Sequence, residues 1–534
     1  MIFFQFLSIM LLLLGIVVIM ILEYFDINKF HPYVTIISIL SSMGSIIYYL
    51  VTDGAPKFFG INVAENLLNY SNSLLVLDQF TAFFAIVFTG IMVLVIFSSI
   101  TDLEDVDKKN HFVYYTLMIF VTIGMILVSS AIDLAALVVS WELVSIPSYL
   151  LVAFMKRDRR TSEAAIKFFI IGSISSALML FGSSFLYGIS GSTNIYAIMK
   201  AVVSLTGTNV VALTPMIIIG LILVLAGLGF KMGIVPFQWW LPDTYEGAMT
   251  SITTMLAAAS KKVGFAAGFR VLTVPLLAFG ATWNSLNINA QEALYTLILV
   301  IAIVTMIVGN IGALAQTKMK RLLAYSSIGQ AGYLLLALGS ASLNTDNNTS
   351  VGLMAGLFHS GSHAIMTAAA FICVLAIFKV INSETIEDYK GLRQYLPKTS
   401  MVLTISLLGL AGIPPLIGFW SKFFVFFAAI DAGNNLGKIL SIGALFYIGA
   451  FVAIMTSAIS VFYYVKVVKY MMVDPVAEEQ KDKVNSYNTK IAWNISLPLF
   501  ISFVIIIFVS LAVGPLIDYL YSVTSSTIGP ILKI

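Results

Sequence analysis

The chain has 534 residues, of which 59% are hydrophobic and only 10% are charged, and its mean hydropathy is +0.98. These values exclude an ordinary water-soluble globular protein and place the chain in the membrane class. The single cysteine, Cys373, excludes an internal disulfide and any zinc or iron–sulfur site that needs several thiolates.

Fourteen apolar stretches are long enough to cross a hydrocarbon core of about 30 Å. In chain order they cover residues 3–22, 33–51, 79–100, 112–129, 131–154, 164–188, 211–240, 249–277, 292–316, 320–340, 352–379, 401–430, 438–468 and 491–520. The first lacks a basic start and a small-residue cleavage site, so we expect a retained helix and not a signal peptide. The sequence therefore predicts an all-α polytopic membrane protein with about fourteen transmembrane helices.

The distribution of positive charge predicts the orientation. Connections from odd to even spans hold nineteen of the 29 Lys and Arg residues, whereas the opposite side holds five: Lys57, Lys200, Arg270, Lys438 and Lys533. Cytoplasmic loops are the ones enriched in Lys and Arg. We therefore expect both termini on the outer side of a prokaryotic plasma membrane.

Four sites carry charge deep inside the apolar stretches: Glu142, Lys231, the pair Lys261 and Lys262, and Lys422. At a helical rise of about 1.5 Å per residue, Glu142 and Lys422 lie roughly 13 Å, and Lys231 roughly 18 Å, from the nearest polar end of their spans. A lysine stem is too short to lift its ammonium over that distance by snorkelling. Each buried charge costs about 2.5–3.5 kcal/mol on insertion scales, so the row indicates a proton path through the membrane.

Two of the lysines lie in spans that glycine and proline interrupt. Lys231 lies within GLGFKMGIVPFQWW (227–240), and Lys422 follows the glycines and prolines of GLAGIPPLIGFWSKFF (409–424). Such interrupted spans at corresponding places in two halves point to an inverted-repeat transporter. Spans seven and twelve are five apart, so we expect broken helices 7 and 12 in two inverted five-helix repeats, spans 4–8 and 9–13.

This arrangement divides the chain into four parts. We expect a three-helix N-terminal segment (1–111), a first repeat (112–277), a second, inverted repeat (292–470), and a cytoplasmic loop with the last span (471–534).

Four motifs carry a family resemblance, and they occur in the expected order. They are WELVSIPSYLL (141–151), GLGFKMGIVPFQWWLPDTYEGA (227–248), QTKMKRLLAYSSIGQAGYLLLA (316–337) and GIPPLIGFWSKFF (412–424). Together they resemble the antiporter-like membrane subunits of respiratory complex I over residues 75–470. The stretch LPDTYEGA with Glu246, and residues 164–188, are similar to the N type, the counterpart of mitochondrial subunit 2. The segment FHSGSHAIMTAAAF (358–371), with His359 and His363, resembles the L and M types instead, so an M-type subunit stays an alternative.

The resemblance implies a role for each buried charge. Glu142 would be the partner of Lys231 and modulate its proton affinity. Lys262, with Lys261 as the alternative, would be the central relay, and Lys422 the terminal group toward the outer side. His359 and His363 lie one helical turn apart and would connect the relay to Lys422, or else make ordinary polar contacts.

The resemblance also implies the surroundings of the chain. Other membrane and peripheral subunits of a complex I-like dehydrogenase, together with lipids, would be its partners, and no nucleic acid would be. Flavin and iron–sulfur clusters would lie in those partner subunits, which pass electrons from a reduced coenzyme to a quinone or phenazine. This chain would be a non-redox translocase subunit of a proton-pumping NADH:quinone oxidoreductase type, without a cofactor or metal of its own.

Three other functions stay open from the sequence. The first is a subunit of a multi-subunit sodium/proton antiporter, whose transport would depend on sodium. The second is an independent solute carrier, for which the sequence offers no side-chain cluster beyond the charge row. The third is an inert assembly scaffold, which would tolerate loss of Lys231.

Overall fold

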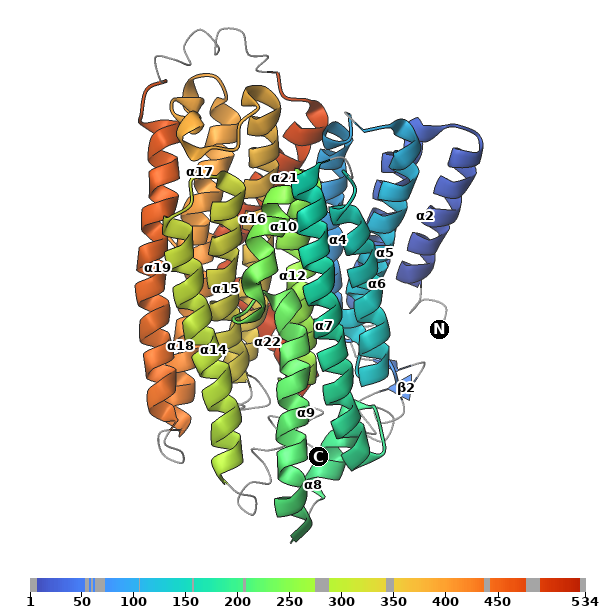
Figure 1. Ribbon diagram of the computed structural model, residues 1–534, viewed down its shortest axis with the longest axis vertical. Helices are drawn as coiled ribbons and strands as arrows, with labels where there is room; N and C mark the ends of the chain where they lie inside the picture. The colour runs from blue at the N-terminus through green and yellow to red at the C-terminus, as the bar shows by residue number, and fades with distance from the viewer. Residues whose placement is uncertain are drawn as a thin grey trace.

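The computed structural model describes residues 7–52, 57–58, 61–62, 73–104, 106–155, 158–204, 208–273, 288–341, 350–436, 442–476 and 490–528. In these ranges the chain is a bundle of long helices that run along its longest axis (Figure 1). The described helices are α2 (Leu7–Tyr24), α3 (His31–Thr52), α4 (Gln79–Asp102), α5 (His111–Ser130), α6 (Leu134–Val152), α7 (Arg159–Ser190), α8 (Ile195–Val203), α9 (Thr208–Met232), α10 (Trp240–Gly247), α11 (Thr250–Met255), α12 (Lys261–Val271), α14 (Ile288–Leu314), α15 (Met319–Ala341), α16 (Val351–Ile381), α17 (Pro397–Ala411), α18 (Ile417–Leu436), α19 (Gly443–Met472), α21 (Trp493–Leu511) and α22 (Val513–Ile528).

Shorter elements complete the described part of the chain. A π-helical segment, η5 (Leu256–Ser260), joins α11 to α12, and two antiparallel strands, β1 (Lys57–Phe58) and β2 (Ile61–Asn62), pair with each other. Short 3-10 turns are η1 (Asn28–Phe30), η3 (Lys108–Asn110), η4 (Phe237–Trp239), η7 (Ile386–Tyr389) and η8 (Leu392–Gln394).

The expectation of a nearly all-helical, multi-pass membrane protein is confirmed. Within the described residues, twelve helical stretches are long and apolar enough to cross a membrane. Within the described residues, neither of the other two predicted spans is a single helix: 249–277 includes α11, η5 and α12, and 401–430 includes parts of α17 and α18. The count of fourteen spans therefore stays a prediction.

The bundle has an enclosed centre and two open sides. In α15, 94% of the most apolar window is buried inside the chain, compared with 28% in α2. Figure 1 shows α2 at one edge and α19 at the other, with α15, α16 and α12 between them. The buried lysines lie in this enclosed centre, where protein surrounds the polar side chains on all sides.

Capping side chains fix where several helices begin. Asp78 accepts a hydrogen bond from the backbone N–H of Thr81 at 2.8 Å, and Asp133 accepts one from that of Ala135 at 2.8 Å. Ser350 does the same for Leu353 at 3.1 Å. Each cap satisfies an N–H group that the first helical turn leaves without a partner.

Glycines in the left-handed region produce the two breaks that the sequence predicts. Gly233 has φ +66° and ends α9, and Gly412 has φ +88° and ends α17. A residue with a Cβ is strained in this conformation, whereas glycine is not. Both broken helices therefore follow from the local sequence, and each break leaves backbone groups that are available to a neighbouring side chain.

Two isolated β-bridges occur in corresponding connections of the two predicted repeats. One joins Asp133 to Asn194, between the connections that follow α5 and α7, and the other joins Lys318 to Thr385, between the connections that follow α14 and α16. In the predicted numbering of spans, the first bridge joins the connection between spans 4 and 5 to the connection between spans 6 and 7. The second bridge joins the connection between spans 9 and 10 to the connection between spans 11 and 12.

Close backbone contact holds α14 against α15. A Cβ added to Gly309 would lie 2.1 Å from the backbone N of Gly329, which no side-chain movement can relieve. We expect Gly309→Ala to separate these helices and to lower the melting temperature of the purified complex. Gly188→Ala in α7 is the matched control, because a Cβ there meets nothing within 4 Å. Equal melting temperatures for the two variants would show that the contact does not contribute to stability.

Candidate proton path

Lys231 lies at the last turn of α9, directly before the break at Gly233. Its side chain is 2% exposed, and its Nζ donates a hydrogen bond to Ser145 Oγ of α6 at 2.9 Å. The ammonium also lies 5.5 Å from the centre of the Trp141 ring, where the negative face of an indole attracts a cation. A single hydroxyl and one aromatic face are thus the contacts that hold this buried cation.

The predicted partner of Lys231, Glu142, lies close by but does not form a direct ion pair. Among the described residues, Glu142 Oε1 is buried without a hydrogen-bond partner, and the hydrogen bond of the Lys231 ammonium goes to Ser145 Oγ. Glu142 lies one helical turn from Ser145, on the same side of α6. It is half-buried, and it shares an outward stripe of α6 with the exposed side chains of Val139 and Ile146.

The two central lysines point to different neighbours. Lys261 Nζ donates to Ser327 Oγ of α15 at 2.9 Å, and a Cβ placed on Gly233 would lie 3.3 Å from the same Nζ. Lys262 Nζ instead lies 2.7 Å from His363 Nδ1 of α16. Lys261 therefore lies at the break beside Lys231, and Lys262 lies toward the histidines.

The π-helical segment η5 ends directly before these lysines. Its five residues, 256–260, are all buried. A π segment inserts an extra residue into the helical turn and frequently occurs at functional sites. It sets the direction in which the two adjacent lysines leave the helix.

The histidines continue the row from Lys262 to Lys422. The ring centres of His363 and His359 are 6.0 Å apart, and His359 Nδ1 lies 3.1 Å from Ser421 Oγ. Ser421 precedes Lys422 in the sequence. His359 Nε2 is buried without a partner among the described residues.

Lys422 contacts the second helix break as Lys261 contacts the first. Its Nζ donates to the carbonyl oxygen of Ala411 at 3.0 Å, which is the last residue of α17, and to Ser457 Oγ at 3.0 Å. The Tyr333 ring centre lies 5.3 Å from the ammonium. Lys422 is 3% exposed. The carbonyl that Gly412 frees at the break is thus used to hold the lysine.

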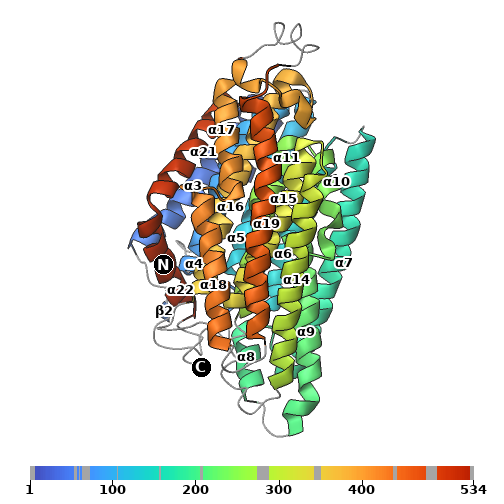
Figure 2. The same ribbon diagram turned by 90° about the vertical axis from the view of Figure 1, so that its left-hand side faces the viewer.

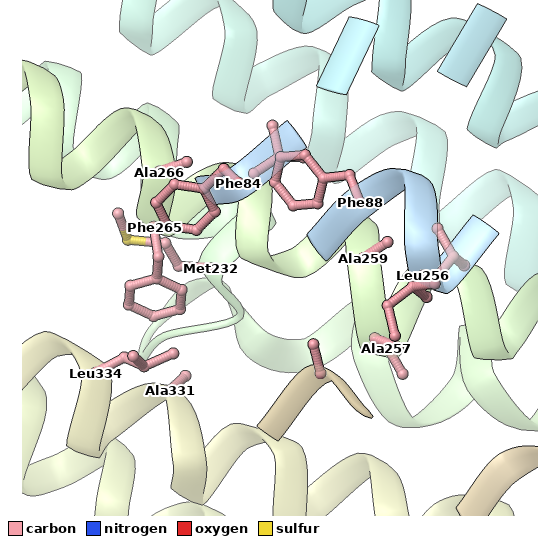
Figure 3. Close-up of a cluster of buried hydrophobic side chains, with 14 of the residues drawn as sticks. Phe84, Phe88, Met232, Leu256, Ala257, Ala259, Phe265, Ala266, Ala331 and Leu334 are labelled. Carbon is pink, nitrogen blue, oxygen red and sulfur yellow. The ribbon is translucent and has the colours of Figure 1, made fainter. Parts of the chain in front are cut away.

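An apolar shell surrounds the central part of the row. Figure 3 shows Phe84 and Phe88 of α4 in a cluster of buried apolar side chains that also includes Phe265 of α12 and Leu334 of α15. These four side chains are completely buried. A low dielectric strengthens every electrostatic interaction within it, so a change of charge at one lysine acts strongly on the next.

The contacts include residues that the sequence analysis did not single out. They are Ser145, Ser327, Ser421, Ser457 and Tyr333, which all contact a lysine or histidine of the row. Only Ser421 has a sequence signal, since it is adjacent to Lys422. The others come from helices far away along the chain.

A chain of alternating charges lies at one end of the bundle and joins α7, α10 and α15. In order of contact it runs Glu163, Lys167, Asp243, Arg321, Glu246 and Lys318. Lys167 Nζ lies 2.7 Å from Asp243 Oδ2, and Arg321 Nη1 lies 2.9 Å from Glu246 Oε2. The N-like residue Glu246 thus joins span 7 to the start of span 10.

Arg270, which the charge count assigns to the outer side, is buried inside the chain. It is 2% exposed and forms a buried pair with Asp78, with Nη2 at 2.7 Å from Oδ1 and Nη1 at 2.9 Å from Oδ2. Nη2 also donates to Thr81 Oγ1 at 3.0 Å. Arg270 therefore fixes the end of α12 to the start of α4.

Among the described residues, no three His, Cys, Asp or Glu side chains gather as a metal site would require. Cys373 is buried and free, and its sulfur lies 3.7 Å from the carbonyl oxygen of Thr399. The groups that gather at the centre are instead proton donors and acceptors: four lysines, two histidines and several hydroxyls.

Fold and site together define a polytopic membrane protein with a row of buried lysine and histidine side chains along its centre. The family described as NADH:quinone oxidoreductase/Mrp antiporter, TM, matches residues 131–447, which is more than half of the chain. The chain belongs to this family of membrane subunits.

Curated relatives agree on the type of subunit. The chain is 37% identical to F(420)H(2) dehydrogenase subunit N of Methanosarcina mazei over 84% of this chain and 85% of the relative. It is 36% identical to NADH-quinone oxidoreductase subunit N of Heliobacterium modesticaldum over 86% of this chain and 87% of that one. The predicted resemblance to the N type is confirmed.

Solved structures share the fold. A chain of respiratory complex I from Thermus thermophilus matches with a TM-score of 0.73 at 24% identity, covering 96% of this chain and 99% of that chain. A chain of the Mrp complex from Dietzia sp. matches with a TM-score of 0.78 at 20% identity, covering all of both chains. The fold alone therefore does not separate dehydrogenase subunits from antiporter subunits, whereas the sequence relatives do.

Proposed function

We propose that this chain is the N-type, proton-translocating membrane subunit of a complex I-like dehydrogenase. The observation that carries the proposal is the row from Lys231 through Lys261, Lys262, His363 and His359 to Lys422, with breaks in two helices beside it. Electron transfer from a reduced coenzyme to a quinone or phenazine would take place in other subunits, which hold the flavin and iron–sulfur clusters. This chain would contribute no redox site.

In this proposal Glu142 and Lys231 form the first station. A charge on Glu142 acts on the Lys231 ammonium through the protein, since Ser145 and not the carboxylate makes the direct hydrogen bond. Lys262 is the central relay, because it is the lysine that contacts His363. Lys261 lies between the first break and Lys262 and is the alternative relay. Lys422 is the terminal donor or acceptor toward the outer side.

Two inverted five-helix repeats, spans 4–8 and 9–13, are part of the proposal. The bridges Asp133–Asn194 and Lys318–Thr385 support it, because they join the same pair of connections in each half. The left-handed glycines Gly233 and Gly412, each beside a lysine, support it further. The four predicted parts, 1–111, 112–277, 292–470 and 471–534, follow from the repeats, with both termini on the outer side of a prokaryotic plasma membrane.

Redox-driven acidification of vesicles tests the proposal. The intact complex is reconstituted, and NADH, reduced ferredoxin or reduced deazaflavin coenzyme is supplied in turn with a quinone or phenazine, with and without sodium. We expect proton movement that depends on one of these donors and not on sodium. If proton movement requires sodium, and if none of these electron donors drives it, the result would favour a subunit of a sodium/proton antiporter instead.

The same vesicles distinguish the two central lysines. We expect Lys262→Met to lower the proton movement per electron at least about tenfold, because methionine keeps the length of the stem but exchanges no proton with His363. Lys261→Met is the matched comparison in the next position, and we expect a smaller loss. An equal or larger loss for Lys261→Met would assign the relay to Lys261.

A further inference from the structure

A groove of about 510 Å³ opens between the start of α17 and the N-terminal half of α21. Figure 2 shows these two helices side by side near the upper end of the bundle. The volume is within the range of roughly 300–1,000 Å³ that is usual for small-molecule sites. The lysine row is not part of this groove, so the function proposed above leaves it unexplained.

One wall of the groove is an apolar helix face. In α21, Ser496, Leu499, Phe500 and Phe503 all line it, at the spacing that brings residues to one side of a helix. Phe500 is 64% exposed, and Met401 on the facing helix α17 is 52% exposed. In a membrane-spanning subunit, such open apolar side chains contact either lipid or a partner subunit, and the groove has room for an apolar chain that enters from the side.

The other feature of the groove is a single positive charge at its polar end. Lys398 lines the groove and is exposed. Within the described part of the chain, Lys398 makes no ion pair. It belongs to the stretch of connection that also carries Lys390 and Arg393, on the side where the positive charges collect.

Aromatic residues mark where the groove lies along the membrane normal. Trp493, at the first residue of α21, is 56% exposed, and Tyr395 lines the groove directly before α17. Tyr and Trp are enriched at the boundary between headgroups and hydrocarbon. Lys398 therefore lies at headgroup level, with the apolar wall of α21 extending below it.

We propose that this groove is a binding site for one anionic phospholipid. Its acyl chain lies along Leu499, Phe500 and Phe503, and its phosphate pairs with Lys398. Basic pockets between transmembrane helices on the cytoplasmic side are suited to anionic headgroups. A free phosphate would not use the apolar wall, and a zwitterionic lipid carries no net charge for the lysine to attract.

Lipid retention by the delipidated complex tests the site. The intact complex is exposed to detergent micelles that contain phosphatidylglycerol, phosphatidylcholine or inorganic phosphate, and bound lipid is counted by native mass spectrometry. We expect the parent complex to retain one phosphatidylglycerol molecule more than the Lys398→Glu variant. Phosphatidylglycerol should bind to that variant at least about fivefold more weakly than to the parent. That factor corresponds to roughly 1 kcal/mol for one lysine near a headgroup, at 1.4 kcal/mol per tenfold.

Two further variants make the result decisive. Ser496→Trp fills the groove but keeps the charge, and Ser496 is exposed, so we expect loss of the same lipid without loss of assembly. Lys109→Glu, at an exposed position of another connection on the same side, is the matched charge control and is expected to retain the lipid. Equal retention of phosphatidylcholine, equal loss with Lys109→Glu, or retention by Ser496→Trp would each overturn the proposal.

Discussion

Replacing Lys231 with methionine is expected to abolish redox-driven proton movement through this subunit and to slow the coupled electron transfer. The ammonium is 2% exposed and is held by a Ser145 hydroxyl and the Trp141 face, with no direct carboxylate. Such a group exchanges its proton at a smaller energetic cost than one locked in an ion pair. We expect a fall of at least about tenfold in protons moved per electron, measured in vesicles that contain the intact complex.

Lys231→Arg separates proton exchange from a structural role. Arginine keeps a positive charge but does not release its proton in proteins. We therefore expect Lys231→Arg to be as inactive as Lys231→Met, and Lys422→Met to be inactive at the other end of the row. Lys109→Met, at an exposed position, is the control and should pump at the parental rate. Parental pumping by either Lys231 variant would make the buried lysine structural, as the scaffold alternative requires.

Breaking the buried pair between Arg270 and Asp78 is expected to have the largest effect on stability. Arg270→Met leaves the Asp78 carboxylate buried without its bidentate partner. Removing one partner of a buried ion pair typically costs about 3–5 kcal/mol. We expect the temperature at which half of the complex loses this subunit, measured by size-exclusion chromatography, to fall by several degrees.

A double variant tests the cause. Asp78→Asn keeps a side-chain oxygen to cap α4 while removing the charge. Combined with Arg270→Met, it should therefore restore part of the lost stability, because no uncompensated charge stays buried. Lys200→Met, at an exposed position, is the control for losing one cation. If the double variant is no more stable than Arg270→Met alone, the pair does not act through charge.

The helices and their breaks could be predicted from the sequence because their causes are local. Apolar stretches of about 20 residues require a membrane, and glycine or proline ends a helix wherever it occurs. Gly233 and Gly412 are the residues at which α9 and α17 end. The depth of Lys231 and Lys422 follows from the same counting.

The contacts of the row could not be predicted, because they depend on which helices become neighbours. Ser327, which contacts Lys261, lies 66 positions from it in the sequence. His363, which contacts Lys262, lies 101 positions from it in the sequence. The π-helical segment before Lys261 has no sequence signature of its own. Arg270 illustrates the same limit, since its charge predicts a side of the membrane but not its burial against Asp78.

The alternating chain from Glu163 to Lys318 contains three acidic and three basic side chains, so its formal charges cancel. At a distance, an electroneutral string of this kind acts as a set of small opposed dipoles, whose field falls off faster than that of an isolated charge. It therefore ties α7, α10 and α15 together at one end of the bundle without adding net charge there. Neutralising one of its members would leave one unbalanced charge at this end of the bundle, so a variant meant only to loosen the helices would also change the charge that joins them.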